Sequence, residues 1–195
     1  MSIIKEKIRA FAISRALNAP RIAVWDAFTK PERLKRWWGP KGFVMRVSWM
    51  DFRPGGIYHY CLRSPDGIDI WGKLAYREIA PPERIVAINS FSNEKGELTR
   101  HPLVTDWPRE MLSTFMFKEA DGQYILTIER VPLNPAAEER AAFENGRDAM
   151  TKGWTGTLDQ LDAYLKSESL LFVEEKMGTP VEEIQDAAMD MENSE

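Results

Sequence analysis

The sequence has few of the residues that build disulfide, metal or redox sites. It contains one cysteine, Cys61, and two histidines among 195 residues. A single cysteine excludes an internal disulfide and a zinc-finger framework. No stretch approaches about 18 uncharged apolar residues, so no membrane span is predicted. The first ten residues alternate isoleucine with charged residues and lack the apolar segment of a signal peptide. We therefore expect a cytoplasmic protein with no metal and no cofactor.

The sequence also lacks a strong excess of charge of either sign. It has 26 Lys and Arg residues against 30 Asp and Glu residues, a net charge of −4. Nucleic-acid-binding domains are usually far more basic, so we expect no nucleic-acid partner. Nine acidic residues and one basic residue lie between Ser167 and Glu195. This imbalance predicts a mildly basic domain over residues 1–166 and an acidic extension over residues 167–195.

Apolar residues alternate with polar ones in a series of short segments, which is typical of strands. In Arg53-Pro54-Gly55-Gly56, Gly55 can supply the positive φ that a tight turn needs, and Asp121-Gly122 favours a hairpin. Short turns predict that consecutive strands pair in an antiparallel manner. Residues 92–109 are polar, contain two prolines and predict a long loop. The predicted strands cover residues 8–16, 43–50, 57–63, 68–79, 84–91, 111–119 and 124–131.

Helical spacing appears in two places within the domain. Two short helices are predicted between residues 20 and 38, where Pro20 and Pro31 suit a first turn. Residues 135–166 carry one apolar stripe and predict a single long helix. Its three glycines, Gly146, Gly153 and Gly156, lower helix propensity, so close packing or a bend should offset them. A further short amphipathic helix is predicted between residues 181 and 191. The predicted fold is α+β, a curved antiparallel sheet of six or seven strands wrapped around the long helix.

Five motifs occur in an order that resembles the activator of Hsp90 ATPase homologue (AHSA1-like) family of the START/Bet v 1 superfamily. The motifs are residues 19–28 (APRIAVWDAF), 31–40 (PERLKRWWGP), 51–56 (DFRPGG), 72–82 (GKLAYREIAPP) and Gly153-Trp154. The resemblance covers about residues 8–166 and implies the helix-grip fold, with a cavity between the sheet and the long helix. It implies little about chemistry, because this superfamily includes lipid carriers, hormone binders, cyclases and co-chaperone domains.

The abundant aromatic residues suggest what would line such a cavity. Tyr58 and Tyr60 share one strand face, and their hydroxyls could orient a polar ligand head. For the strand residues, the register decides which face of the sheet they occupy. No catalytic residue is assigned. The candidate cavity residues are Phe43, Tyr58, Tyr60, Trp71, Phe91, Phe115, Met150, Trp154 and Leu158.

Other residues have competing interpretations. Trp37 and Trp38 could gate the cavity mouth, but pinning the short helix to the sheet is the favoured account. His59 and Cys61 lie roughly 6.5 Å apart on one strand face, too far for a direct catalytic pair. His101 is expected to be exposed in the long loop. Five basic residues, Lys30, Arg33, Lys35, Arg36 and Lys41, predict a solvated basic face, for which the acidic extension is one candidate partner.

Three functions remain open at this point. The first is a soluble protein that holds a hydrophobic or amphipathic small molecule in the cavity. The second is a protein-interaction module, with an Hsp90-type chaperone as its partner. The third is a cyclase-like or dehydratase-like enzyme that uses Tyr58, Tyr60 or Glu129 as acid–base groups. A homodimer formed by exchange of the C-terminal helix also stays open.

Overall fold

The computed structural model describes residues 8–120 and 123–177 of the chain. Seven strands and four helices follow one another in the order that the sequence predicts, apart from a division of the long helix. The strands are β1 (Phe11–Leu17), β2 (Val44–Met50), β3 (Ile57–Arg63), β4 (Asp69–Ala80), β5 (Arg84–Ser92), β6 (Glu110–Ala120) and β7 (Gln123–Pro132). The helices are α1 (Arg21–Thr29), α2 (Pro31–Leu34), α3 (Ala137–Asn145) and α4 (Arg147–Met177).

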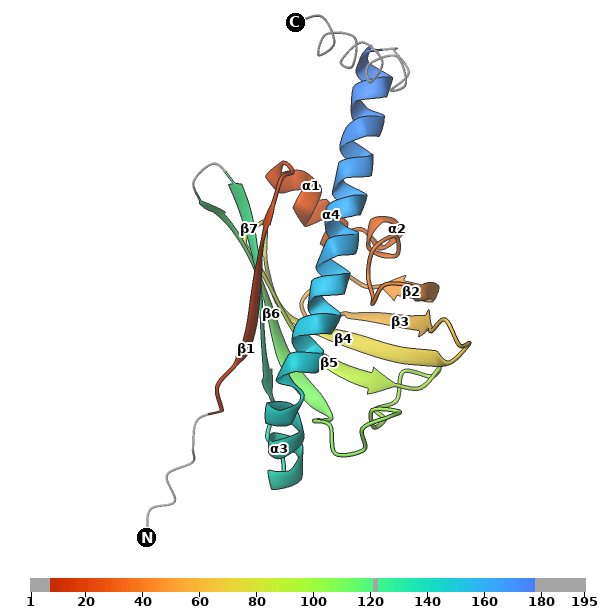
Figure 1. The fold of residues 1–195 in the computed structure, drawn as a ribbon, viewed down its shortest axis with the longest axis vertical. Helices are drawn as coiled ribbons and strands as arrows, with labels where there is room; N and C mark the ends of the chain where they lie inside the picture. Colours follow the sequence, from red (N-terminus) through yellow and green to blue (C-terminus); the bar gives the residue numbers. More distant parts are fainter. Residues whose placement is uncertain (1–7, 121–122, 178–195) are drawn as a thin grey trace, which may run out of the picture.

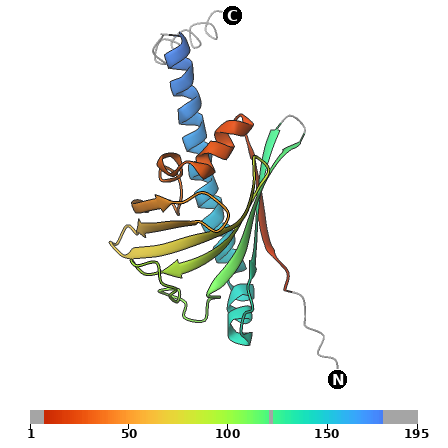
Figure 2. The same ribbon diagram turned by 180° about the vertical axis from the view of Figure 1, so that it is seen from behind.

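The strands form one antiparallel sheet in the order β1-β7-β6-β5-β4-β3-β2. Consecutive strands from β2 to β7 are neighbours, and β1 joins the far edge by pairing with β7. The sheet curves around α4, which runs along the long axis of the molecule, while α1 and α2 lie beside the middle of that helix (Figures 1 and 2). This arrangement is the helix-grip fold, so the predicted fold class is confirmed.

The long helix differs from its prediction in two respects. It is divided at Gly146, which separates α3 from α4, and α4 then continues to Met177, beyond the predicted end at residue 166. The chain packs closely at this division, because a Cβ atom built on Gly146 would lie 2.6 Å from Cζ3 of Trp107. The β5–β6 loop therefore packs into the gap that the glycine leaves. The predicted helix at residues 181–191 and the Asp121-Gly122 turn lie outside the described residues.

An irregularity in β2 changes which of its side chains face inward. The register between β2 and β3 shifts between Met45 and Val47, so the residue between them acts as a bulge. Met45 and Met50 both pack against the core, although strict alternation would place them on opposite faces. Val47 and Trp49 are 37% and 55% exposed as a result. The alternation predicted from residue 43 onward is therefore wrong within this strand.

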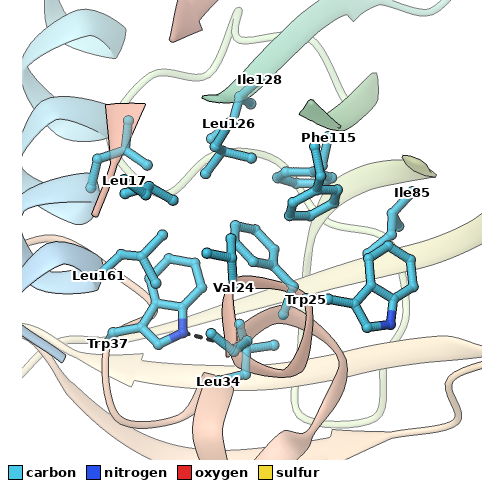
Figure 3. Packing of buried hydrophobic residues seen from close by; sticks show 14 of the residues in the cluster. Leu17, Val24, Trp25, Leu34, Trp37, Ile85, Phe115, Leu126, Ile128 and Leu161 are labelled. Atoms are coloured by element: carbon cyan, nitrogen blue, oxygen red, sulfur yellow. Dashed lines mark hydrogen bonds between the residues drawn. The ribbon is translucent and has the colours of Figure 1, made fainter. Parts of the chain in front are cut away.

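The main core lies where α1 and α2 meet the middle of α4 (Figure 3). Trp37 is almost fully buried, and its indole N–H donates to the Ala27 carbonyl at 3.0 Å. Its ring centroid lies 4.8 Å from that of Phe28. Leu158 and Leu161 of α4 complete the same cluster from the helix side. Trp37 thus pins the short helices to the core, as the sequence favours.

Candidate functional site

A pocket of about 600 Å³ lies beside this core, between the inner face of the sheet and the first half of α4. Its volume is within the range of ligand sites, roughly 300–1,000 Å³. The wall draws on β3 to β7, on the α3–α4 junction and on the β5–β6 loop, which lies at the α3 end of the molecule (Figure 1). Six aromatic side chains contribute to it: Trp38, Tyr60, Phe91, Trp107, Phe115 and Trp154.

Four aromatic rings separate the pocket from the main core. Trp38 lies edge-on to Trp154 at 5.8 Å between ring centroids and to Tyr60 at 6.1 Å. Phe115 lies 6.2 Å from Trp38. Such edge-to-face contacts stabilise the rings beyond their simple burial. Trp37 and Trp38 therefore have different roles, because the first belongs to the core and the second to the pocket wall.

The helix stripe also divides between core and pocket. Met150, Gly153 and Trp154 lie on the pocket wall, whereas Leu158 and Leu161 are fully buried in the core. A Cβ atom at Gly153 would meet no other atom within 4 Å, so this glycine leaves the pocket open. The first two turns of α4 thus border the pocket, and the following turns pack into the core.

The β5–β6 loop forms the rim of the pocket. The His101 ring lies 4.6 Å from Phe91 between centroids, and its Nδ1 accepts hydrogen bonds from the backbone N–H groups of Leu103 and Val104 at 3.0 and 3.1 Å. Burial lowers the pKa of His101 below its ordinary value. A neutral ring with an unprotonated Nδ1 therefore fixes this corner of the loop. The expectation that His101 is exposed is wrong, since the residue is half-buried on the pocket wall.

One charged side chain, Arg130 of β7, reaches the pocket from the sheet. Its Nε donates to Ser113 Oγ at 3.2 Å, and its terminal N–H groups donate to Asn89 Oδ1. Asn89 in turn donates to the Lys73 carbonyl at 3.4 Å, which orients its amide. The guanidinium carbon lies 5.8 Å from the Trp154 ring centroid. Arg130 is therefore held between two neutral polar side chains and an aromatic face.

The electrostatics of this corner follow from burial. Burial lowers the pKa of Arg130 to about 10, and no carboxylate acts in the opposite direction. The guanidinium still carries its charge at neutral pH. Burial also raises the pKa of Tyr60, while Trp38, Asn89 and the Arg130 charge partly offset that rise. Among the described residues that line the pocket there is no aspartate or glutamate.

The candidate cavity residues divide into three groups. Those on the pocket wall are Tyr60, Phe91, Phe115, Met150 and Trp154. Tyr58 and Leu158 face inward but are fully buried in the core, and the Tyr58 ring stacks on Tyr60 at 5.1 Å. Phe43 and Trp71 lie away from the pocket lining. Trp71 stacks on His59, at 5.0 Å between ring centroids.

The His59 and Cys61 pair forms no catalytic arrangement. The His59 ring is stacked on Trp71, and its Nε2 lies 3.1 Å from the Asn93 carbonyl. Cys61 is buried, and burial raises the pKa of its thiol. Within residues 8–120 and 123–177, no group of three or more His, Cys, Asp or Glu side chains could hold a metal ion. In the same residues, no helix is both long and apolar enough to cross a bilayer.

Sequence reasoning missed the polar residues of the pocket, although the sequence carries a signal for them. In β7, Tyr124, Leu126 and Ile128 are buried and alternate with more exposed residues. Arg130 continues the buried phase of this alternation. A charged residue in the apolar phase of a strand points to a polar group inside the fold.

Comparison with solved structures finds the same fold in bacterial proteins. A Nitrosomonas europaea protein has 23% identity and a TM-score of 0.64, covering 82% of this chain and 96% of that one. A Mycobacterium smegmatis protein has 24% identity and a TM-score of 0.64, with coverage of 80% and 90%. The AHSA1 protein of Silicibacter pomeroyi has 17% identity and a TM-score of 0.63, with coverage of 82% and 99%. At these identities the likeness shows the fold alone.

Comparison by sequence gives the family. No curated protein matches the chain. The family model described as activator of Hsp90 ATPase homolog 1-like protein matches residues 18–166, which is most of the chain. The match includes the seven-stranded sheet from β2 onward, both short helices and the pocket-lining part of α4. The chain therefore belongs to the activator of Hsp90 ATPase homolog 1-like family.

Proposed function

We propose that this protein is a cytoplasmic binding protein that holds a hydrophobic or amphipathic small molecule in the pocket between the sheet and α4. The observation that supports this proposal is that one part of α4 packs into the core and another part lines the pocket. Its middle turns bury leucines against the core, whereas Gly153, nearer the start of the helix, leaves space beside Met150 and Trp154. A pocket with aromatic walls and a few convergent polar groups is the usual form of a small-molecule site.

Filling the pocket from Gly153 tests the proposal. In Gly153→Leu, the new side chain enters the pocket and takes the place of about four ligand carbon atoms. At about 0.8 kcal/mol per buried methylene, the loss approaches 3 kcal/mol, or about a hundredfold in affinity. Gly156→Leu is the matched control, because Gly156 also has no atom within 4 Å of its Cβ position and does not line the pocket.

The assay uses N-phenylnaphthylamine, a neutral apolar dye whose fluorescence rises on burial, with native mass spectrometry to detect any co-purified ligand. We expect wild type and Gly156→Leu to bind the dye with similar affinity and Gly153→Leu to bind it about a hundredfold more weakly. Absence of dye binding and of any mass adduct in the wild type would count against the proposal. Equal binding by the two leucine variants would place the dye elsewhere.

A second candidate function is supported by the edge of the sheet. Val44, Val47 and Trp49 of β2 are 61%, 37% and 55% exposed, and β2 has a neighbouring strand on one side only. An exposed apolar strip on an edge strand suits contact with another protein. The family description suggests an Hsp90-type chaperone as that partner. Titration of the purified protein with a homologue of that chaperone, with and without Trp49→Ser, tests this candidate directly.

The enzyme hypothesis has less support. The Tyr58 hydroxyl bonds to Ser48 at 3.3 Å inside the core, and burial raises its pKa. Glu129 is exposed. We therefore propose no reaction.

We keep residues 1–166 as the proposed binding domain and residues 167–195 as its extension, although α4 runs through this boundary and Glu168 pairs with Arg36 at 2.8 Å.

A further inference from the structure

The remaining question about the pocket is which class of small molecule it takes. Arg130 gives the most specific information, because a charge that is partly removed from water is unfavourable unless it is paired. In the described part of the chain, none of the ion pairs includes Arg130. Its two hydrogen-bond acceptors, Ser113 and Asn89, are neutral. The guanidinium is thus solvated by the protein but not neutralised.

The hydrogen-bonding capacity of Arg130 is also incompletely used. A guanidinium has five N–H donors, and the described residues accept from its Nε and from one terminal nitrogen. The other terminal nitrogen has no protein acceptor recorded among these residues. Arg130 is half-buried and belongs to the pocket lining, so the surface that it still exposes faces the pocket. A planar acceptor with two oxygens suits donors in this geometry.

We propose that the pocket takes an amphipathic monoanion, a carboxylic acid with an apolar body, whose carboxylate binds the Arg130 guanidinium. The aromatic wall formed by Trp38, Phe115 and Trp154 would contact the apolar body. This inference rests on the proposed function and adds the class of ligand to it. A bound carboxylate would supply the missing counter-charge.

The charge of the wall favours a single negative charge over a doubly charged phosphate. Arg130 is the one Lys or Arg side chain on the pocket wall as the structure describes it. His101, the other ionisable nitrogen base there, is kept neutral at neutral pH by burial. A dianion would therefore retain an uncompensated charge inside the fold, whereas a carboxylate would not.

A matched series of ligands tests this inference on the wild-type protein. Laurate, lauramide and dodecylamine share one apolar tail and carry a negative, neutral and positive head. Each is used, below its micellar concentration, to displace N-phenylnaphthylamine. We expect laurate to bind about ten- to a hundredfold more tightly than lauramide, as for a hydrogen bond to a charged group. We expect dodecylamine to bind most weakly, because its charge has the same sign as that of Arg130.

Variants test whether Arg130 causes the preference for laurate over lauramide. Arg130→Gln should bind laurate and lauramide equally while retaining the dye, and Arg130→Lys should keep part of the preference, because a lysine retains the charge and loses the fork. Arg77→Gln is the control, since Arg77 of β4 is exposed. Circular dichroism and thermal unfolding check that each variant is folded.

The outcomes separate this inference from the proposed function. Dye binding with equal affinity for laurate and lauramide in the wild type would overturn the carboxylate inference and leave the pocket function standing. A laurate preference that persists in folded Arg130→Gln would also overturn it. Failure of the dye to bind at all would instead refute the proposed function. If Arg130→Gln does not fold, the wild-type ligand series still decides the point.

Discussion

The junction between α3 and α4 gives a prediction whose sign follows directly from the structure. The variant Gly146→Ala would place a Cβ atom 2.6 Å from Cζ3 of Trp107 and 3.0 Å from the Ala142 carbonyl oxygen. Gly146 has φ −84° and ψ 1°, which an alanine can adopt, so the effect is steric and not conformational. Overpacking of this kind costs about 1–3 kcal/mol.

One smaller effect opposes the clash. Replacing glycine by alanine reduces the entropy of the unfolded chain and stabilises a compatible site by about 0.4–1 kcal/mol. We therefore expect Gly146→Ala to lower the free energy of unfolding by about 1–2 kcal/mol, or the melting temperature by about 2–4 °C per kcal/mol for a chain of this size. Gly156→Ala lies in the helix interior with open space around its Cβ position and should instead be stabilising by up to about 1 kcal/mol.

Urea unfolding followed by far-ultraviolet circular dichroism measures both variants without relying on tryptophan fluorescence. A double-mutant cycle with Trp107→Leu isolates the contact, because Gly146→Ala should be nearly neutral once the indole is absent. We expect a coupling energy of about 1–2 kcal/mol. If Gly146→Ala is as stable as Gly156→Ala in the wild-type background, or if the coupling is close to zero, the Trp107 indole does not require a glycine at position 146 and the steric explanation of this residue fails.

Two further predictions concern the pocket rim and the core. The folded pKa of His101 lies below its unfolded value near 6.5, so its contribution to stability is present above pH 6.5 and is lost as the pH falls through the folded pKa. In His101→Asn, the side-chain oxygen can accept from the same loop N–H groups, so this variant should lose neither stability nor dye binding on the acid side. An unchanged pH profile would refute the assignment. Trp37→Phe removes the donor to the Ala27 carbonyl and leaves a void in the core. Urea unfolding should therefore show a free energy of unfolding that is lower by about 2–4 kcal/mol. A change below 1 kcal/mol would show that the indole does not anchor the short helices.

The positions of the strands could be predicted from the sequence because their periodicity is local. Strand β3 is observed at Ile57–Arg63, as predicted, and Gly55 has φ +83° in the preceding turn, as the turn requires. The boundary between α3 and α4 was less predictable, because its glycine, Gly146, packs against Trp107, which is distant in the sequence. Glycine within a helical stripe indicates that something unusual occurs, but it does not indicate whether a ring, a bend or a pocket is responsible.

The faces of the strands illustrate the same limit. Alternation from residue 43 places Met45, Val47 and Trp49 together, and the bulge after Met45 reverses the last two. A bulge adds one residue to one strand and has no local hydrophobic signature. Tyr58 shows a second limit, because it faces inward as expected and yet lies in the filled part of the interior. The alternation of residues along a strand predicts which face of the sheet each residue occupies. The boundary between core and pocket depends instead on how other helices and loops pack against that face.

The polar group around Arg130 combines both kinds of information. Asn89, Ser113 and Arg130 each occupy the inward phase of their strands, between apolar residues. Strand register then brings them together, since Ser113 is directly opposite Arg130, and Asn89 lies two residues from the partner of Ser113 on β5. Three polar residues that replace apolar ones on the inward faces of three strands thus meet at one point of the sheet. A core selected only for stability would place apolar side chains there, because replacing a buried ionic group by well-packed apolar residues is often neutral or stabilising. That convergence at the pocket wall, and not in the filled core beside it, is the physical reason to connect Arg130 with a ligand.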